Sequence, residues 1–240
     1  MYRLVDAESQ SVLVVAEDIR GFFVGPDRQP DGLITFTGLC QAPLVKQKIE
    51  EAQLEVLNHR QERIGSYDAG PVLLTPGHGA VGGERGDLEC SYLGYTCEYE
   101  SAGEIWRRWA QEIPLEQREW ARWPAGSHWS WLHVAQVAWF TGRRRAMNYG
   151  TASEASIDGG VIYNKASFYC ALGEAVNGPG GYFGSNIDAV ADCLSASRES
   201  MANFQLTWDR SALSRELLGE GFMASVARVM RDFGVDIIHR

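Results

Sequence analysis

The chain has 240 residues, which is more than one typical domain, so we expect two domains. An apolar content of 45% with 22% charged residues is typical of a folded globular protein and argues against disorder and membrane insertion. The formal net charge of -9 argues against direct binding of nucleic acid, because phosphate binding needs clustered lysine and arginine. An acidic protein can instead imitate nucleic acid.

The apolar segments and the cysteines of the sequence indicate where the protein is located. No basic segment followed by an apolar one opens the chain, and the longest apolar run, around 129–140, is too short to span a bilayer. The five cysteines show no paired spacing, which fits reduced thiols better than disulfides. We therefore expect a cytoplasmic protein that does not bind membranes.

The first part of the chain is rich in β-prone segments. Short runs at 12–16, 22–24 and 33–37 are separated by Gly/Pro/Asp turn signals at 25–27 and 30–32. These patterns predict strands joined by turns.

Two further elements are expected before residue 100. Pro43 followed by Val45, Ile49, Ala52 and Val56 at helical spacing predicts an amphipathic helix over 43–57. Alternating apolar residues on either side of Leu93-Gly94 predict a hairpin over 88–99.

Tryptophan is concentrated in one segment, with seven of the eight between residues 106 and 139. Ser101 and Glu104 form a possible capping box, which predicts a short helix ending before Pro114. The rings could form a core and the seam between two domains, or an aromatic groove for a ligand; the segment has no polar cluster to accompany a groove, which favours the core. His128 and His133 lack the spacing of a metalloprotease site and are interpreted as structural or surface residues.

Candidate catalytic groups of the first part have no motif that fixes their geometry. Cys40, His78, Asp87 and Cys90 could form a nucleophile with its helpers, but no nucleophile elbow or zinc spacing is present. The glycine-rich run 77–86 lacks the Gly-Lys-Ser/Thr of a phosphate-binding loop. We predict no enzyme activity, no metal and no cofactor. Residues 1–140 are expected to form a strand-rich α+β domain of unknown role, followed by a polar linker over 141–158.

A glycine-rich loop at 178–184 precedes the most informative stretch of the sequence. Four glycines and a proline within these seven residues require positive φ angles or close backbone approach. Asn186 is a good N-cap for a helix that continues to Ala196. Tyr182 and Phe183 lie in a segment with little apolar cover of its own, so we expect their rings to be exposed.

Two carboxylates follow the cap. Asp188 and Asp192 are four residues apart, so they share one helix face and repel each other by a few tenths of a kcal/mol. Asp188 can be explained as a partner of the helix dipole, whereas Asp192 has no local helical reason to be acidic. An acidic face beside exposed rings is typical of a surface for a cationic partner.

These residues carry a resemblance to a known family. The segments 182–184, 186–189 and 192–194 resemble the signature of the barstar family, intracellular bacterial inhibitors of secreted ribonucleases. The likeness covers 159–240 and extends to the order of elements: strand 161–163, helix 167–176, strand 204–208, helices 211–218 and 222–233, and strand 235–239. It implies an α/β domain with a three-stranded parallel sheet and helices, preceded here by the α+β, strand-rich domain.

The resemblance also implies a binding surface. Asp192 would enter the phosphate site of the enzyme, with Asp188, Asp232 and the backbone around Gly184 surrounding it and the two rings covering the active-site mouth. The full set comprises Tyr182, Phe183, Gly184, Asn186, Asp188, Ala191, Asp192 and Asp232. Some members also have a purely structural explanation: Asn186 can be a helix cap, and Gly184 can be required by the backbone. Ile187 and Cys193, which are outside the set, are expected in the core.

Three members depart from the family pattern. Ala191 stands where the family often has Trp, Phe183 replaces a second Tyr, and Asp232 replaces Glu. These departures imply a cognate enzyme other than the one that barstar binds.

The sequence therefore predicts a stoichiometric protein inhibitor, of the immunity or antitoxin type, whose partner is a basic bacterial ribonuclease or related nuclease toxin. The alternative is a non-inhibitory interaction or regulatory module in which the N-terminal domain carries the main role.

Overall fold

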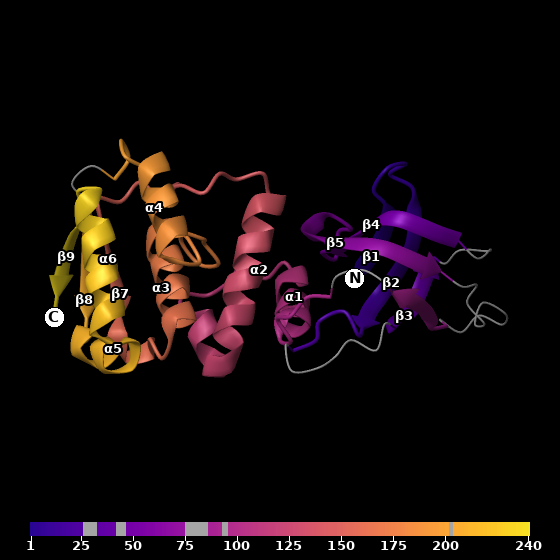
Figure 1. Ribbon diagram of the computed structural model, residues 1–240, viewed down its shortest axis with the longest axis horizontal. Coiled ribbons are helices and arrows are strands. Elements are labelled where there is room, and N and C mark those ends of the chain that lie inside the picture. The colour runs from indigo at the N-terminus through magenta and orange to yellow at the C-terminus, as the bar shows by residue number, and fades with distance from the viewer. Residues whose placement is uncertain (26–32, 42–46, 75–85, 93–95, 202–203) are drawn as a thin grey trace. The chain divides into compact units, whose positions relative to one another are not determined.

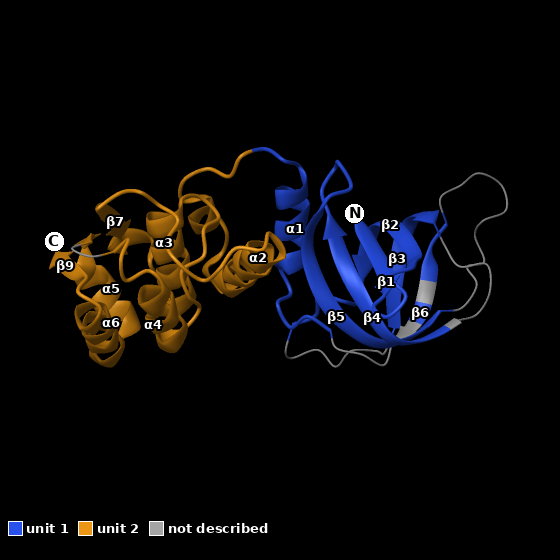
Figure 2. Ribbon diagram, turned by 90° about the horizontal axis from the view of Figure 1, so that it is seen from above, with its two compact units in different colours: residues 1–113 blue, residues 114–240 orange. Residues whose placement is uncertain are grey.

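The computed structural model describes residues 1–25, 33–41, 47–74, 86–92, 96–201 and 204–240. The chain forms two compact units, Met1–Ile113 and Pro114–Arg240 (Figure 2). This division precedes the predicted end of the first domain at residue 140, because the segment from Pro114 onward packs with the C-terminal elements. Among the helices of the described ranges, none combines the length and apolar character needed to cross a bilayer.

Unit 1 is an antiparallel sheet that closes on itself. Its strands in the described ranges are β1 (Tyr2–Asp6), β2 (Val12–Arg20), β3 (Leu33–Gln41), β4 (Gln47–Leu57), β5 (Arg63–Leu74) and β6 (Leu88–Tyr92). They form a closed barrel in the order β1-β2-β3-β6-β5-β4. The neighbours β4-β1-β2-β3 have Greek-key order. Among the described strands, closure gives each one a neighbour on both sides.

The predicted helix over 43–57 is wrong, since β4 occupies Gln47–Leu57 and residues 42–46 lie outside the described residues. Ala52, Leu54 and Val56 alternate inward, each about 1% exposed, with the period of a strand. The register with β5 shifts between Ile49 and Ala52, so these two apolar residues are three apart and both buried. A β-bulge thus imitates the spacing of a helix.

Other elements of unit 1 are partly as predicted. The strands at 12–16 and 33–37 are confirmed within β2 and β3. The predicted hairpin over 88–99 is not formed among the described residues: β6 pairs with β3 and β5, and Cys97 pairs with Phe23. The turn signals at 26–32 and 93–95 lie outside the described residues.

The helix α1 (Ala102–Ala110) begins where the sequence predicts but without the capping box. Ser101 has helical φ and ψ angles, and its side chain makes no capping hydrogen bond. The helix is attached to the sheet by Trp106, which is fully buried and donates from Nε1 to the Tyr67 hydroxyl at 2.7 Å. Gly65 permits this contact, because a Cβ there would lie 2.7 Å from the indole ring.

Unit 2 contains a parallel sheet with helices (Figure 1). Its strands β7 (Glu154–Asp158), β8 (Gln205–Asp209) and β9 (Asp236–His239) lie side by side in that order, all parallel. Its helices are α2 (His128–Thr141), α3 (Lys165–Asn177), α4 (Ile187–Ala196), α5 (Ser211–Leu218) and α6 (Glu220–Asp232), with 3-10 turns η1 (Glu119–Arg122), η2 (Ala125–Ser127) and η3 (Gly159–Val161).

The helices cover one face of this sheet. That face carries Ile157 and Trp208, and the Trp208 ring stacks on Phe168 of α3 with 5.1 Å between centroids. Helix α3 packs on β7, α6 packs on β9, and α4 packs on α6. The other face of β7 is open, with Glu154 and Ser156 exposed.

The first strand of the sheet lies earlier than predicted. The expected strand at 161–163 is wrong: a 3-10 turn ends at Val161, and β7 occupies Glu154–Asp158 inside the predicted linker. Because one face of β7 meets water, its sequence has few apolar residues, whereas Ile162 is a fully buried loop residue. The remaining helices and strands follow the predicted order from α3 to β9.

The part of the tryptophan-rich segment that belongs to unit 2 forms a layer on α3. Helix α2 packs along α3, and Trp120 and Trp131 are each 2% exposed. His128 is fully buried, with Nδ1 2.7 Å from Ser167 Oγ and Nε2 3.1 Å from the Trp123 carbonyl oxygen. The interpretation of these tryptophans as core is confirmed for Trp106, Trp120, Trp131 and Trp139, and His128 is structural.

The rest of the predicted linker is held against α3 and α4. The backbone N–H of Asn148 donates to Ser197 Oγ at 2.7 Å, and that of Tyr149 donates to Asn177 Oδ1 at 2.8 Å. Residues 142–151 therefore follow a fixed course between α2 and β7 instead of forming a solvated connection.

This arrangement predicts that residues 114–240 fold as a unit and residues 152–240 do not. Removing 114–151 exposes the outer face of α3 and takes away several buried aromatic side chains, each worth about 3–5 kcal/mol, against a typical domain stability of about 5–15 kcal/mol. Thermal unfolding followed by far-UV circular dichroism should be cooperative for the longer fragment and absent or broad for the shorter one. Equal melting temperatures would contradict the packing described above.

Candidate functional site: the acidic face of helix α4

The start of α4 is fixed by two residues of the predicted site. Asn186 is the N-cap, as predicted: its backbone is extended and its Oδ1 accepts a hydrogen bond from the Ala189 N–H at 2.8 Å. Gly184 has φ +98°, and a Cβ there would lie 2.7 Å from the Val190 backbone nitrogen. Both residues are therefore required by the local backbone, whatever else they contact.

The two helix carboxylates are available at the surface. Asp188 and Asp192 are both exposed and lie one turn apart on α4. Within the described part of the chain, neither side chain forms a hydrogen bond or ion pair with a neighbour. No described cationic side chain thus neutralises them, and the face that they share is free to meet a cation.

Asp232 adds a third exposed carboxylate from a neighbouring helix. It is the last residue of α6, the helix that packs on α4. A negative charge at a helix C-terminus opposes the helix dipole and is locally unfavourable. The side chain makes no hydrogen bond or ion pair with other described residues, so its own helix gives no reason for its charge.

The prediction that Tyr182 and Phe183 are exposed is wrong, since they are 3% and 0% exposed. Asn177 Nδ2 donates to the Tyr182 carbonyl oxygen at 2.9 Å, which holds the loop against the end of α3. The Tyr182 ring packs edge-on against Phe140 of α2, with 5.6 Å between centroids. Apolar cover absent from the loop itself is supplied by a helix more than forty residues earlier in the chain.

Buried groups beneath the acidic face are affected by its charges. Burial raises the pKa of the Cys193 thiol to about 12, and the charge of Asp192 adds to the effect. Burial likewise raises the pKa of Tyr169 to about 12, with a contribution from Asp188. Cys193 is fully buried, as predicted, whereas Ile187 is only half-buried.

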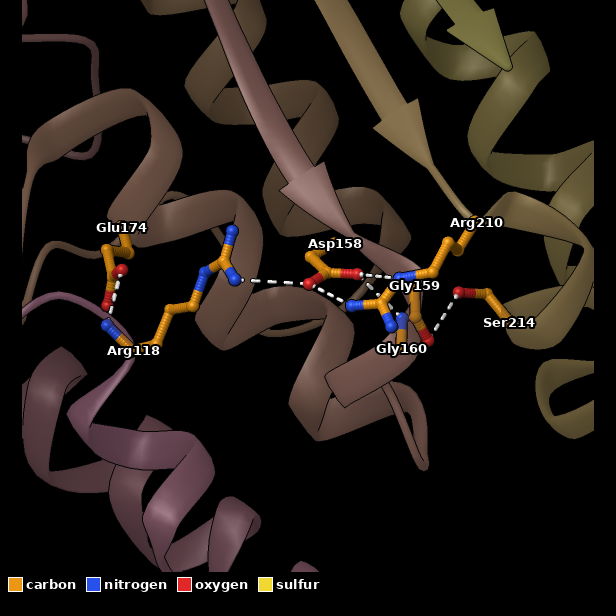
Figure 3. Close-up of polar contacts among 7 residues, drawn as sticks. All are labelled: Arg118, Asp158, Gly159, Gly160, Glu174, Arg210 and Ser214. Carbon is orange, nitrogen blue, oxygen red and sulfur yellow. Dashed lines mark hydrogen bonds and ion pairs between the residues drawn. The ribbon is translucent and has the colours of Figure 1, made fainter. Parts of the chain in front are cut away.

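A second polar cluster, which sequence reasoning missed, lies at the carboxyl ends of β7 and β8 (Figure 3). Arg210 Nε donates to Asp158 Oδ1 at 2.8 Å and its Nη2 donates to Oδ2, while Arg118 Nη1 donates to Oδ2 at 3.1 Å. Burial alone would raise the pKa of Asp158, but these contacts and the Gly160 N–H hold it below its usual value. The Arg118 N–H also donates to Glu174 Oε1 at 2.8 Å.

This cluster is a structural clamp. Ligands of parallel α/β sheets bind beyond the carboxyl ends of the strands. Here the guanidinium of Arg210 fills that space, since a Cβ on Gly160 would lie 2.2 Å from its Cζ atom. The sequence does contain a signal for this turn, since Asp158 is followed by two glycines. It was missed because residues 141–158 were interpreted as a linker.

The open face of the sheet has a polar hollow of about 420 Å³ lined by both acidic and basic side chains. The lining residues are Glu154, Ala155, Ser156, Thr207, Asp209 and Arg240. Such mixed charges define no particular ligand.

The candidate catalytic residues of unit 1 are not brought together. Cys90 pairs in register with Ile34, and Cys40 lies six residues farther along β3, about 20 Å away. Cys90 is buried and Asp87 is exposed, while His78 lies outside the described residues. Over the described ranges, no three His, Cys, Asp or Glu side chains are grouped so as to hold a metal ion.

Unit 2 is an α/β domain with a parallel sheet, and its helix α4 has two exposed carboxylates without a cationic partner among the described residues. Residues 152–237 match the family model described as Barstar (barnase inhibitor). The C-terminal part of the chain is thus a barstar-family domain, and it begins at β7, earlier than the resemblance over 159–240 indicated. The match covers little more than a third of the chain. No curated protein matches the chain significantly.

The loop geometry predicts different effects for two glycine substitutions. Gly184→Ala should destabilise unit 2 by about 2 kcal/mol or more, because a positive φ is combined with a backbone clash at Val190. Gly178→Ala should cost less, because its backbone (φ +79°, ψ 178°) is also unfavourable for alanine but no atom lies within 4 Å of an added Cβ. Guanidinium unfolding of residues 114–240 measures both, and equal losses would contradict the role given to Gly184.

Proposed function

We propose that this protein is a stoichiometric inhibitor, of the immunity or antitoxin type, of a bacterial ribonuclease. At the level of the family, the barstar domain supports a barnase-inhibitor-like role. The observation that carries the proposal is the group of exposed, unpaired carboxylates on α4 and α6, Asp188, Asp192 and Asp232. The protein acts in the cytoplasm by binding the enzyme, and it performs no catalysis and binds neither nucleic acid nor membrane.

Inhibition occurs by occlusion of the active site. A ribonuclease must hold the phosphates of RNA with cationic side chains, and a carboxylate can occupy the same position as a phosphate oxygen. Charge-assisted hydrogen bonds to a guanidinium are roughly twice as strong as neutral ones. Asp192 takes the deepest position, with Asp188, Asp232 and the Gly184 backbone around it.

The other members of the predicted binding set have supporting roles. Asn186 fixes the first turn of α4, and Ala191 is a small, half-buried residue between the two acids. Tyr182 and Phe183 act from the interior, because their buried rings hold the backbone that presents Gly184. A cation in the enzyme also relieves the repulsion between Asp188 and Asp192. The relief of this repulsion adds to the free energy of binding.

The direct test is an inhibition titration with the full-length chain. RNA cleavage by barnase, and by ribonuclease toxins encoded beside the gene, is measured as the protein is added. We expect at least one of these enzymes to lose activity in proportion to the protein, reaching zero at one molecule per enzyme, with association slower at high salt. Activity unchanged for every enzyme of the panel would overturn the proposal and favour a module in which unit 1 carries the main role.

The site assignment predicts a large effect of Asp192→Asn on the inhibited enzyme. Truncation of a central interface residue typically costs about 2 kcal/mol or more, so the Kd should rise by about 30-fold or more. Glu216→Gln is the matched control: it removes one exposed negative charge on α5, which lies at the other end of unit 2 from α4 (Figure 1). Calorimetric titration measures both. If the two variants lose affinity equally, net charge and not the α4 face determines binding.

A further inference from the structure

An exposed aromatic ring from outside the matched segment contacts the loop that precedes α4. Phe140 lies near the end of α2, before the matched residues 152–237, and is 45% exposed. Its neighbour Trp139 is only 3% exposed and packs against Tyr149. The last turn of α2 therefore has one buried ring that stabilises the fold and one ring that faces solvent.

The position of Phe140 is tied to α4 through Tyr182. The two rings are 5.6 Å apart, and the Tyr182 hydroxyl donates to Ser185 Oγ at 3.4 Å, one residue before the cap Asn186. Burial raises the pKa of Tyr182, and the charge of Asp192 adds to this shift. Phe140 thus contacts the buried residue whose hydroxyl reaches the segment that starts α4.

Exposed aromatic rings and unpaired carboxylates are both common in protein interfaces. Aromatic residues are enriched at the centres of protein interfaces, and a guanidinium that binds a carboxylate can also pack on an adjacent ring. Helix α4 itself has no aromatic residue between Ile187 and Ala196. Phe140 is the ring that borders Tyr182 from α2 and remains half exposed to a partner.

We propose that Phe140 is part of the surface that binds the ribonuclease, where its ring packs on a cationic side chain at the edge of the enzyme's active site. The proposal rests on the inhibitory function above and extends its site beyond the family domain. Specificity for the cognate enzyme then depends on two segments, the acidic face of α4 and the end of α2.

The neighbouring charges limit how far this contact extends. The arginine run 143–145 follows α2 directly and is exposed, and the Arg144 guanidinium lies 4.6 Å from the centre of the Trp139 ring. These positive charges repel a basic enzyme. The enzyme therefore contacts α2 at Phe140 and is kept away from the residues that follow.

The test compares Phe140→Ala with Trp129→Ala in the full-length chain, using the ribonuclease that the wild-type protein inhibits in the titration above. Trp129 is the matched control, because it is 40% exposed on the same helix but eleven residues away, about 16 Å along the axis. We expect Phe140→Ala to raise the Kd by about tenfold, mainly through faster dissociation, and Trp129→Ala to leave it unchanged.

Phe140→Leu separates binding from packing, since leucine keeps apolar cover over Tyr182 but removes the ring. A loss of affinity for Phe140→Leu at an unchanged melting temperature supports the proposal. An unchanged Kd for both Phe140 variants, with Asp192→Asn still weakened, overturns it while the inhibitory function stands. If the wild-type protein inhibits none of the enzymes of the panel, both this proposal and the inhibitory function are overturned.

Discussion

The side-chain amide of Asn177 makes the hydrogen bonds on which the placement of the acidic helix depends. Its Nδ2 donates to the carbonyl oxygens of Met147 and Tyr182, at 3.2 and 2.9 Å, and its Oδ1 accepts from the Tyr149 N–H at 2.8 Å. One residue at the end of α3 thus joins the segment 142–151 to the glycine-rich loop. The loop in turn sets Gly184 against Val190 and starts α4, so its carboxylates are held on a rigid scaffold.

The acidic residues of unit 2 differ in whether a cationic or hydrogen-bonding partner lies beside them. Asp158 contacts two arginines, and Glu174 accepts the Arg118 N–H. Asp188, Asp192 and Asp232, by contrast, have no such partner among the described residues, and the last opposes the dipole of its own helix. Asp188 lies where the helix dipole favours an acid, whereas Asp192 and Asp232 have no stabilising role in their own helices, as is common for residues of a binding surface.

Sequence reasoning succeeded where local signals determine structure. The Asn186 cap depends on residues a few positions apart, whereas the order of elements from α3 to β9 was implied by the resemblance to the barstar family. It failed where distant residues decide: the bulge of β4 imitates a helical period, and the open face of β7 removes the apolar pattern of a strand. The burial of Tyr182 could not be read from its loop, because the cover comes from α2.

The family match covers residues 152–237, whereas the compact unit covers Pro114–Arg240. This difference bears on the proposed function. Helix α2 lies before the matched residues, yet it covers α3 through His128 and reaches the loop before α4 through Phe140. Any layer that covers the outer face of α3 must border that loop, because the loop begins where α3 ends. In the binding mode that we propose, a protein bound to the first turns of α4 also meets Phe140 of α2, and the same added segment then both stabilises the domain and selects its partner.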